Sequence, residues 1–193
     1  MPYVQNALGF TIETIFGLFL IAAILRFLFE LPGVDSRNPI AQTVFVATNY
    51  PLKILRPFIP GLYGINLASV LLIIIISFLK YGLLIIVSGY PFHFTGVLVI
   101  GIGEAINTTT WIFLIAIIVQ AILSWVAPSS YHPIIAALRG LSEPVLSLFR
   151  RFLPNLQGLD LSPILAILAI NLIQNLVAYP IIDFGKALMM NSL

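Results

Sequence analysis

The chain has 193 residues, of which 60% are apolar and only 8% are charged, whereas about 25% of the residues in a soluble domain are charged. So few polar side chains cannot cover a surface that faces water, and the mean hydropathy of +1.09 excludes an ordinary soluble enzyme. The 9 Lys and Arg residues only slightly exceed the 7 Asp and Glu residues, so direct binding of nucleic acid is not expected. The chain contains no cysteine, which excludes disulfides and thiol catalysis. The composition predicts an integral membrane protein.

A helix needs about 20 mainly apolar residues to cross a bilayer. Four segments meet this requirement and predict an all-α protein with four transmembrane helices, approximately residues 7–29, 67–88, 96–126 and 161–182. We expect the first to be a retained span rather than a removed signal peptide, because no Lys or Arg precedes it. The third is long for one straight span, and Gly101-Ile102-Gly103 is compatible with a kink, a tilt or a late entry into the bilayer.

Positive residues predict the orientation of the spans. They gather in the connections that follow spans one and three, as Arg37, Lys53, Arg56, Arg139, Arg150 and Arg151. Because cytoplasmic loops are enriched in Lys and Arg, both connections are predicted to be cytoplasmic and both termini to lie outside. The connection 89–95 carries neither residue type, which agrees, whereas Lys186 near the C-terminus opposes the assignment.

The chain contains an internal repeat. Residues 56–69 align with residues 150–163, 94 positions later, with six of fourteen pairs identical: RPFIPGLYGINLAS and RRFLPNLQGLDLSP. Upstream, Asn38-Pro39 corresponds to His132-Pro133. We therefore predict two repeats, 1–94 and 95–193, each with a span, a cytoplasmic segment and a second span. Since both segments lie on one side, the repeats would share one orientation and be related by an axis along the membrane normal.

This doubled pattern carries a resemblance to a known family. Asn/His-Pro, a second proline, Arg-x-Phe-Ile/Leu-Pro and Gly-Ile/Leu-Asn/Asp-Leu together resemble the YggT (YlmG-like) family over nearly the whole chain. The first copy departs from it, with Pro57 in place of the second arginine and Asn66 in place of the acidic residue. The resemblance implies a multi-pass protein of the bacterial inner membrane. It also implies links to osmotic or potassium tolerance and envelope organisation, and in plastid relatives to cytochrome b6 haem maturation and nucleoid distribution.

Two segments, 38–59 and 132–153, are predicted to be amphipathic helices in the membrane interface. Pro39 and Pro133 suit the first turn of a helix, and Asn38 can cap the first of the two. We expect a bend at Pro51 and a break near Pro144.

These segments allow two interpretations. In the first, they only return the chain to the bilayer, and their arginines set the topology. In the second, they dock anionic lipid headgroups or a membrane-protein partner through Arg56, Arg150 and Arg151.

In the turns that follow these segments, Gly64 and Gly158 permit unusual backbone angles. Asn66 and Asp160 can cap the next span.

Polar residues inside the predicted spans indicate either a functional site or a specific pairing. Counted from the outer ends of the spans, the ionisable ones lie at a similar depth, roughly 9 to 12 Å. We predict one intramembrane polar cluster of Glu13, Lys80, Glu104, Gln174 and Asn175. It is either interhelical glue, in which Lys80 pairs with a carboxylate, or a cation or proton site, or a set of side chains that face lipid or water.

The remaining polar residues do not point to chemistry. Arg26, near the inner end of its span, is predicted to reach the cytoplasmic headgroups. His93 and His132 lie at different faces and do not make a haem pair, and Asn107-Thr108-Thr109 is a chance glycosylation triplet inside a span. No catalytic, cofactor-binding or metal-binding set is recognised, so we expect no enzyme and no cofactor.

Two functions remain. The favoured one is a non-catalytic organising or assembly factor that acts through the two cytoplasmic segments. The alternative is ion transport or a role in osmotic or potassium homeostasis through the intramembrane polar cluster, and this would require a homo-oligomer or a larger partner because four spans enclose little room.

Overall fold

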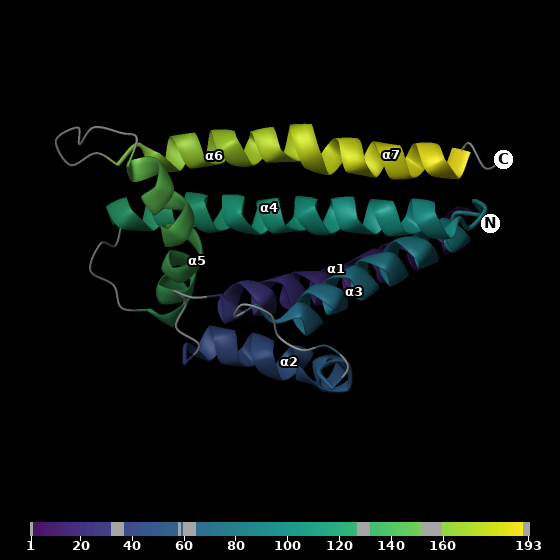
Figure 1. Ribbon diagram of the computed structural model, residues 1–193, viewed down its shortest axis with the longest axis horizontal. Helices are drawn as coiled ribbons and strands as arrows, with labels where there is room; N and C mark the ends of the chain where they lie inside the picture. Colours follow the sequence, from purple (N-terminus) through teal and green to yellow (C-terminus); the bar gives the residue numbers. More distant parts are fainter. Residues whose placement is uncertain are drawn as a thin grey trace.

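The computed structural model describes residues 2–31, 37–57, 59, 65–126, 132–151 and 160–190. The fold within them is helical (Figure 1). In chain order the helices are α1 (Pro2–Glu30), α2 (Pro39–Leu55), α3 (Leu67–Val87), α4 (Phe94–Val126), α5 (Pro133–Arg150), α6 (Ser162–Ile173), the π-helical turn η1 (Gln174–Ala178) and α7 (Tyr179–Met190).

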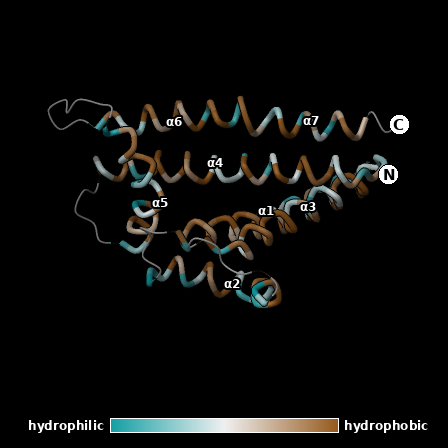
Figure 2. Tube along the Cα trace, viewed as in Figure 1, coloured by the Kyte–Doolittle hydropathy of each residue, from teal (hydrophilic) through white to brown (hydrophobic). Residues whose placement is uncertain are grey.

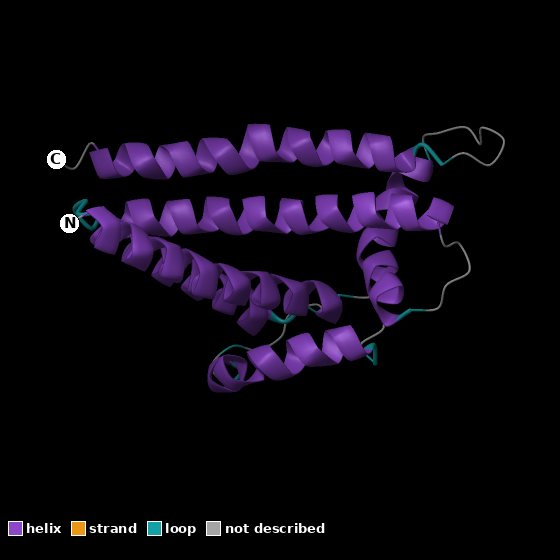
Figure 3. Cartoon of the chain, turned by 180° about the vertical axis from the view of Figure 1, so that it is seen from behind, coloured by secondary structure: helices purple, strands orange, loops and turns teal. Residues whose placement is uncertain are grey.

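Four of the helical stretches are long and apolar enough to cross a membrane: Tyr3–Glu30, Leu67–Val87, Phe94–Ser124 and Ser162–Met190. This confirms the predicted fold class. Figure 2 shows hydrophobic residues along the length of these stretches. They form a bundle with both chain ends at one extremity, here called the termini end (Figure 1). Helices α2 and α5 lie across the other extremity, and we call them the α2–α5 layer (Figure 3).

Helix α4 is the centre of the bundle, where it packs against α3 on one side and α7 on the other. It runs unbroken through Gly101 and Gly103, so the glycines mark close packing rather than a kink. A Cβ atom at Gly103 would lie 2.7 Å from Cγ1 of Ile182, and one at Gly185 would lie 2.9 Å from the backbone nitrogen of Ile100. Small residues at such contacts let the backbones of membrane helices approach one another.

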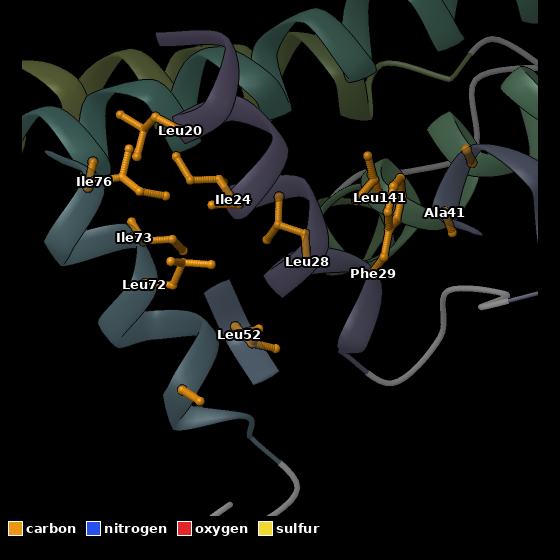
Figure 4. Close-up of a cluster of buried hydrophobic side chains, with 14 of the residues drawn as sticks. Leu20, Ile24, Leu28, Phe29, Ala41, Leu52, Leu72, Ile73, Ile76 and Leu141 are labelled. Carbon is orange, nitrogen blue, oxygen red and sulfur yellow. The ribbon is translucent and has the colours of Figure 1, made fainter. Parts of the chain in front are cut away.

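The largest group of buried apolar side chains joins α1 to α3. Leu20, Ile24 and Leu28 recur every four residues, so they form one stripe along α1 that faces α3 (Figure 4). The group continues to the α2–α5 layer, where Leu141 of α5 lies beside Phe29 of α1 (Figure 4). The two halves of the chain therefore meet in this core.

The α2–α5 layer begins in the same way in both halves. The side chains of Asn38 and His132 accept hydrogen bonds from the backbone N–H two residues later, and a proline follows each of them. Asn38 Nδ2 also donates to the Pro133 carbonyl at 2.7 Å, which ties the start of α2 to the start of α5.

The two internal prolines of this layer act differently. Helix α2 contains Pro51, and its last part is seen end-on in Figure 1 while its first turns run across the picture, so the helix bends as predicted. The predicted break near Pro144 is not seen, because α5 is one helix from Pro133 to Arg150. Leu141 and Leu146, on either side of this proline, are both buried, and this packing holds the helix in one piece.

The fourth span differs from a regular helix. The π-helical turn Gln174–Ala178 ends two residues before Pro180, whose ring would clash with a carbonyl of a regular α-helix one turn earlier. The helix then continues to Met190, beyond the expected end near Ile182. The exposed pair of Lys186 and Asp183, with 3.0 Å between Nζ and Oδ1, lies on this additional part.

Candidate functional site

The α2–α5 end of the first half holds a buried arginine. Only 4% of Arg26 is exposed, so it does not reach the headgroups as expected from its position in the sequence. Its guanidinium instead donates to the carbonyl of Phe45 at 2.8 Å and to Oγ1 of Thr48 at 3.1 Å, both on α2. It also pairs with Glu30 one turn later, at 3.1 Å. These acceptors replace water around the charge, which is why the arginine is held inside.

Glu30 is the acceptor that connects three elements. Besides Arg26, its carboxylate lies 3.6 Å from a guanidinium nitrogen of the half-exposed Arg56. It accepts a hydrogen bond from Asn66 at 3.2 Å and one from Ser69 at 2.6 Å. Asn66 therefore stands at the start of α3 without capping it through its side chain. Glu30 is not among the predicted site residues, although its spacing of four residues from Arg26 is the sequence signal that indicates this pairing.

The second half arranges the corresponding charges around Arg150. This arginine forms ion pairs with Glu143 of α5 and with Asp160, the latter at 2.9 Å. Oδ1 of Asp160 also accepts the backbone N–H of Ser162 at 2.9 Å, so it satisfies the first backbone donor of α6 from the residue before the N-cap Leu161. Burial alone would raise the pKa of Asp160, but hydrogen bonds from Ser162 and Arg150 hold it below its ordinary value. Arg151 is exposed beside this group.

Lys80 of α3 is the cation of the predicted intramembrane polar cluster. Only 8% of this lysine is exposed, and its ammonium lies beside Gly17 of α1 and 5.1 Å from the centre of the Tyr81 ring. Among the described residues, no carboxylate oxygen lies within ion-pair distance of it. A cation over an aromatic face is stabilised by the ring quadrupole. The Tyr81 ring therefore takes the place of the carboxylate with which Lys80 pairs in the glue interpretation.

A second part of this cluster links α4 to the fourth span. Asn107 Nδ2 donates to Glu104 at 3.4 Å, and Gln174 Nε2 donates to Oδ1 of Asn107 at 3.4 Å. Tyr81 also interacts with Glu104, which joins this chain to the lysine. Asn107 was read in the sequence as part of a chance glycosylation triplet, and its spacing of three residues from Glu104 is the signal of its role.

The structure places the five predicted cluster residues in two environments. Lys80 and Gln174 are buried and Glu104 is half-buried. Glu13 and Asn175 are exposed on the outside of the bundle, where Asn175 donates to the carbonyl of Asn171 on its own helix. Successive side chains of a helix point about 100° apart, so the neighbouring amides of Gln174 and Asn175 face different surroundings.

Two cavities lie beside this cluster. One of about 460 Å³ is lined by Tyr81, Glu104 and Lys186 together with apolar residues towards the termini end. The other, of about 660 Å³, lies between the cluster and α5 and has an almost wholly apolar wall. Its polar residues are Thr109 and Thr110, whose hydroxyls donate to carbonyls of their own helix. Their hydrogen-bonding capacity is thus largely used inside α4.

Some expected site features are not part of this geometry. Gly64 and Gly158 lie outside the described residues. Over the part of the chain that is described, no group of three or more His, Cys, Asp or Glu residues is placed to hold a metal ion.

The four apolar spans, the two halves of equal element order and the layer across one end define a multi-pass helical membrane protein built from tandem repeats. The CCB3/YggT family matches residues 5–87 and 99–181, two ranges offset by 94 residues at both ends. The chain belongs to this family, as the repeated motif predicted.

Named relatives cover the chain to different extents. An uncharacterized protein of Pseudomonas aeruginosa is 40% identical over 175 residues, 90% of this chain and 89% of its own. The uncharacterized protein YggT of Escherichia coli K12 is 30% identical over 186 residues, 96% of each chain. The chloroplastic YlmG homolog protein 2 of Arabidopsis thaliana is 47% identical over 55 residues, 28% of this chain and 22% of its own. No solved structure matches the chain.

Proposed function

We propose that the protein is a non-catalytic organising or assembly factor of the bacterial inner membrane. In this proposal both termini lie outside and the α2–α5 layer faces the cytoplasm. The layer is the working surface, and it contacts anionic lipid headgroups and a membrane-protein partner. Two such layers brought together in a homo-oligomer would widen the same surface.

The observation that carries the proposal is the outer face of α2. Val46, Tyr50 and Ile54 recur every four residues and are all exposed, while Thr48 and Leu52 on the opposite face are buried. An exposed apolar stripe on a helix whose opposite face is already packed supports a position in the membrane interface or against a partner helix.

Exposed cations lie on both helices of the α2–α5 layer. Lys53 lies on α2, Arg139 on α5 and Arg151 at the end of α5. Each cation near an anionic membrane surface contributes about 1 kcal/mol of attraction, so three of them favour attachment to lipid headgroups or to an acidic partner.

Ion transport remains the second candidate because a lysine and a carboxylate inside a membrane bundle are costly unless they are used. Against it stands the large cavity between the cluster and α5, because an ion that left Glu104 would meet apolar walls there. A path would require several copies of the chain, with polar groups contributed between them.

The two functions respond differently to mutation. In cells that lack the endogenous protein, we expect the triple variant Lys53→Gln, Arg139→Gln, Arg151→Gln to fold and insert but to fail to restore growth after an osmotic shift. Its three side chains are exposed and belong to no ion pair among the described residues, so the fold does not depend on them.

The matched variant is Glu13→Gln with Glu104→Gln. It removes both carboxylates of the predicted cluster, the exposed Glu13 and the half-buried Glu104, and leaves the α2–α5 layer intact, so we expect it to restore growth as the wild type does. Loss of rescue by this double variant, with full rescue by the triple variant, would reverse the ranking of the two functions.

A further inference from the structure

A third cavity lies between α4, α5 and α6 in the second half of the chain. It has a volume of about 340 Å³ and combines aliphatic walls with the polar side chains of Gln120, Ser124, Arg150 and Asp160. Ile118, Ile122 and Ile164 of its wall are also exposed at the outside of the bundle. The cavity therefore opens towards the side of the protein that meets lipid.

The two halves of the chain carry different residues at the position of Gln120. The family repeats are offset by 94 residues, so Gln120 stands where the first half has Arg26. The local structure is otherwise alike, since Thr48 donates to the carbonyl of Val44 and Ser142, its counterpart, donates to that of Leu138. The first half fills this position with its own guanidinium, whereas the second half has a shorter, neutral side chain beside a cavity.

Gln120 has an unused acceptor. Its Oε1 atom is buried and has no hydrogen-bond partner within the described part of the chain. A buried acceptor left without a donor is unfavourable, so a ligand that brings an N–H group would be favoured there.

The charges around the cavity also favour a cation. Arg150 is shared by the two carboxylates of Glu143 and Asp160, so this group has a surplus of negative charge. Arg151 supplies an exposed positive charge next to it. An ammonium group with a phosphate close by complements this pattern, and acyl chains complement the isoleucine wall.

We propose that this cavity binds a phospholipid with a primary ammonium headgroup, of the phosphatidylethanolamine type. The ammonium donates to Gln120 Oε1 and to Asp160, the phosphate contacts Arg151, and an acyl chain lies along the exposed isoleucines. The ligand takes the place that Arg26 occupies in the first half. The site does not depend on the proposed organising role, because it requires no protein partner.

Native mass spectrometry of the purified, delipidated protein in detergent tests this site. We expect phosphatidylethanolamine to bind about tenfold more tightly than phosphatidylcholine or phosphatidylglycerol of the same acyl composition. Phosphatidylcholine has no N–H to donate, and phosphatidylglycerol has no cation. Equal binding of the three lipids, or a preference for phosphatidylglycerol, would overturn the proposal.

Two variants locate the binding. Gln120→Arg recreates the first-half residue and should fill the cavity, and Asp160→Asn removes the charge while retaining a side chain that can cap α6. We expect each to abolish the preference for phosphatidylethanolamine, whereas Asp183→Asn, which alters a carboxylate on α7, retains it. If Gln120→Arg does not fold, the Asp160→Asn result alone decides. A preference that persists in folded Asp160→Asn would refute the site.

Discussion

At the scale of single residues, the arginine at the end of α2 and the arginine at the end of α5 each form an ion pair with a carboxylate. The two carboxylates come from different elements. In the first half Glu30 of α1 meets Arg56, with Asn66 as a neutral neighbour. In the second half Asp160, which corresponds to Asn66, meets Arg150. The departure of the first copy from the repeat motif is therefore compensated by an acid elsewhere in the fold.

The Glu30 network should contribute strongly to stability. Glu30→Gln leaves the buried guanidinium of Arg26 without its charged partner, and we expect a loss of about 3 kcal/mol in the free energy of unfolding. Unfolding titrations in a mild detergent measure it. The control, Asp183→Asn, breaks an exposed pair on α7 and should cost less than about 0.5 kcal/mol. Equal losses in the two variants would contradict the role given to Glu30.

Asp160 should make stability depend on pH. Its native pKa is lower than the ordinary value of 3.8, so the carboxylate stabilises the fold fully above that value. This contribution is lost as the pH falls through the lower native pKa, because the unfolded chain takes up the proton first. Melting temperatures measured between about pH 6 and pH 3 should fall less steeply in Asp160→Asn than in the wild type. Identical slopes would show that the pairing with Arg150 adds nothing.

At the scale of elements, the sequence predicted the spans and the starts of the layer helices, because hydropathy and capping are local properties. The continuous α4 and the π-helical turn before Pro180 depend on packing against neighbours, which a single sequence does not display. The same holds for the candidate site. Polar residues at matching depth were recognisable, but the contact of Lys80 with Tyr81 and the outward position of Glu13 follow from helix rotation in the bundle.

Close packing of α4 on α7 yields a prediction at this scale. Gly103→Val inserts a branched side chain where a Cβ atom would already lie 3.1 Å from the backbone nitrogen of Ile182, so we expect a loss of about 1 to 3 kcal/mol in stability. Gly9→Val is the matched control, because nothing lies within 4 Å of a Cβ atom there. Thermal unfolding in detergent compares them. If Gly103→Val melts at no lower a temperature than Gly9→Val, α4 and α7 are not in tight contact.

At the scale of the whole molecule, both termini and the α3–α4 connection lie at one end, and the α2–α5 layer lies at the other (Figure 1). The absence of cysteine from the sequence allows single-cysteine labelling of each end. An impermeant maleimide applied to intact spheroplasts should label Ser88→Cys, in the α3–α4 connection, but label Asn49→Cys of α2 only after permeabilisation. If only Asn49→Cys is labelled in intact spheroplasts, the orientation of the protein is the reverse of the one predicted.

In the proposed function, the α2–α5 layer, rather than an ion path, is the working part of the molecule. Ion flux in liposomes that contain the purified protein, with potassium and protons monitored, distinguishes the two. We expect no flux above that of empty liposomes, because the apolar cavity beyond Glu104 separates the polar cluster from the layer. Flux that the wild type supports and that Glu13→Gln with Glu104→Gln abolishes would refute the organising role and make the polar cluster a transport site.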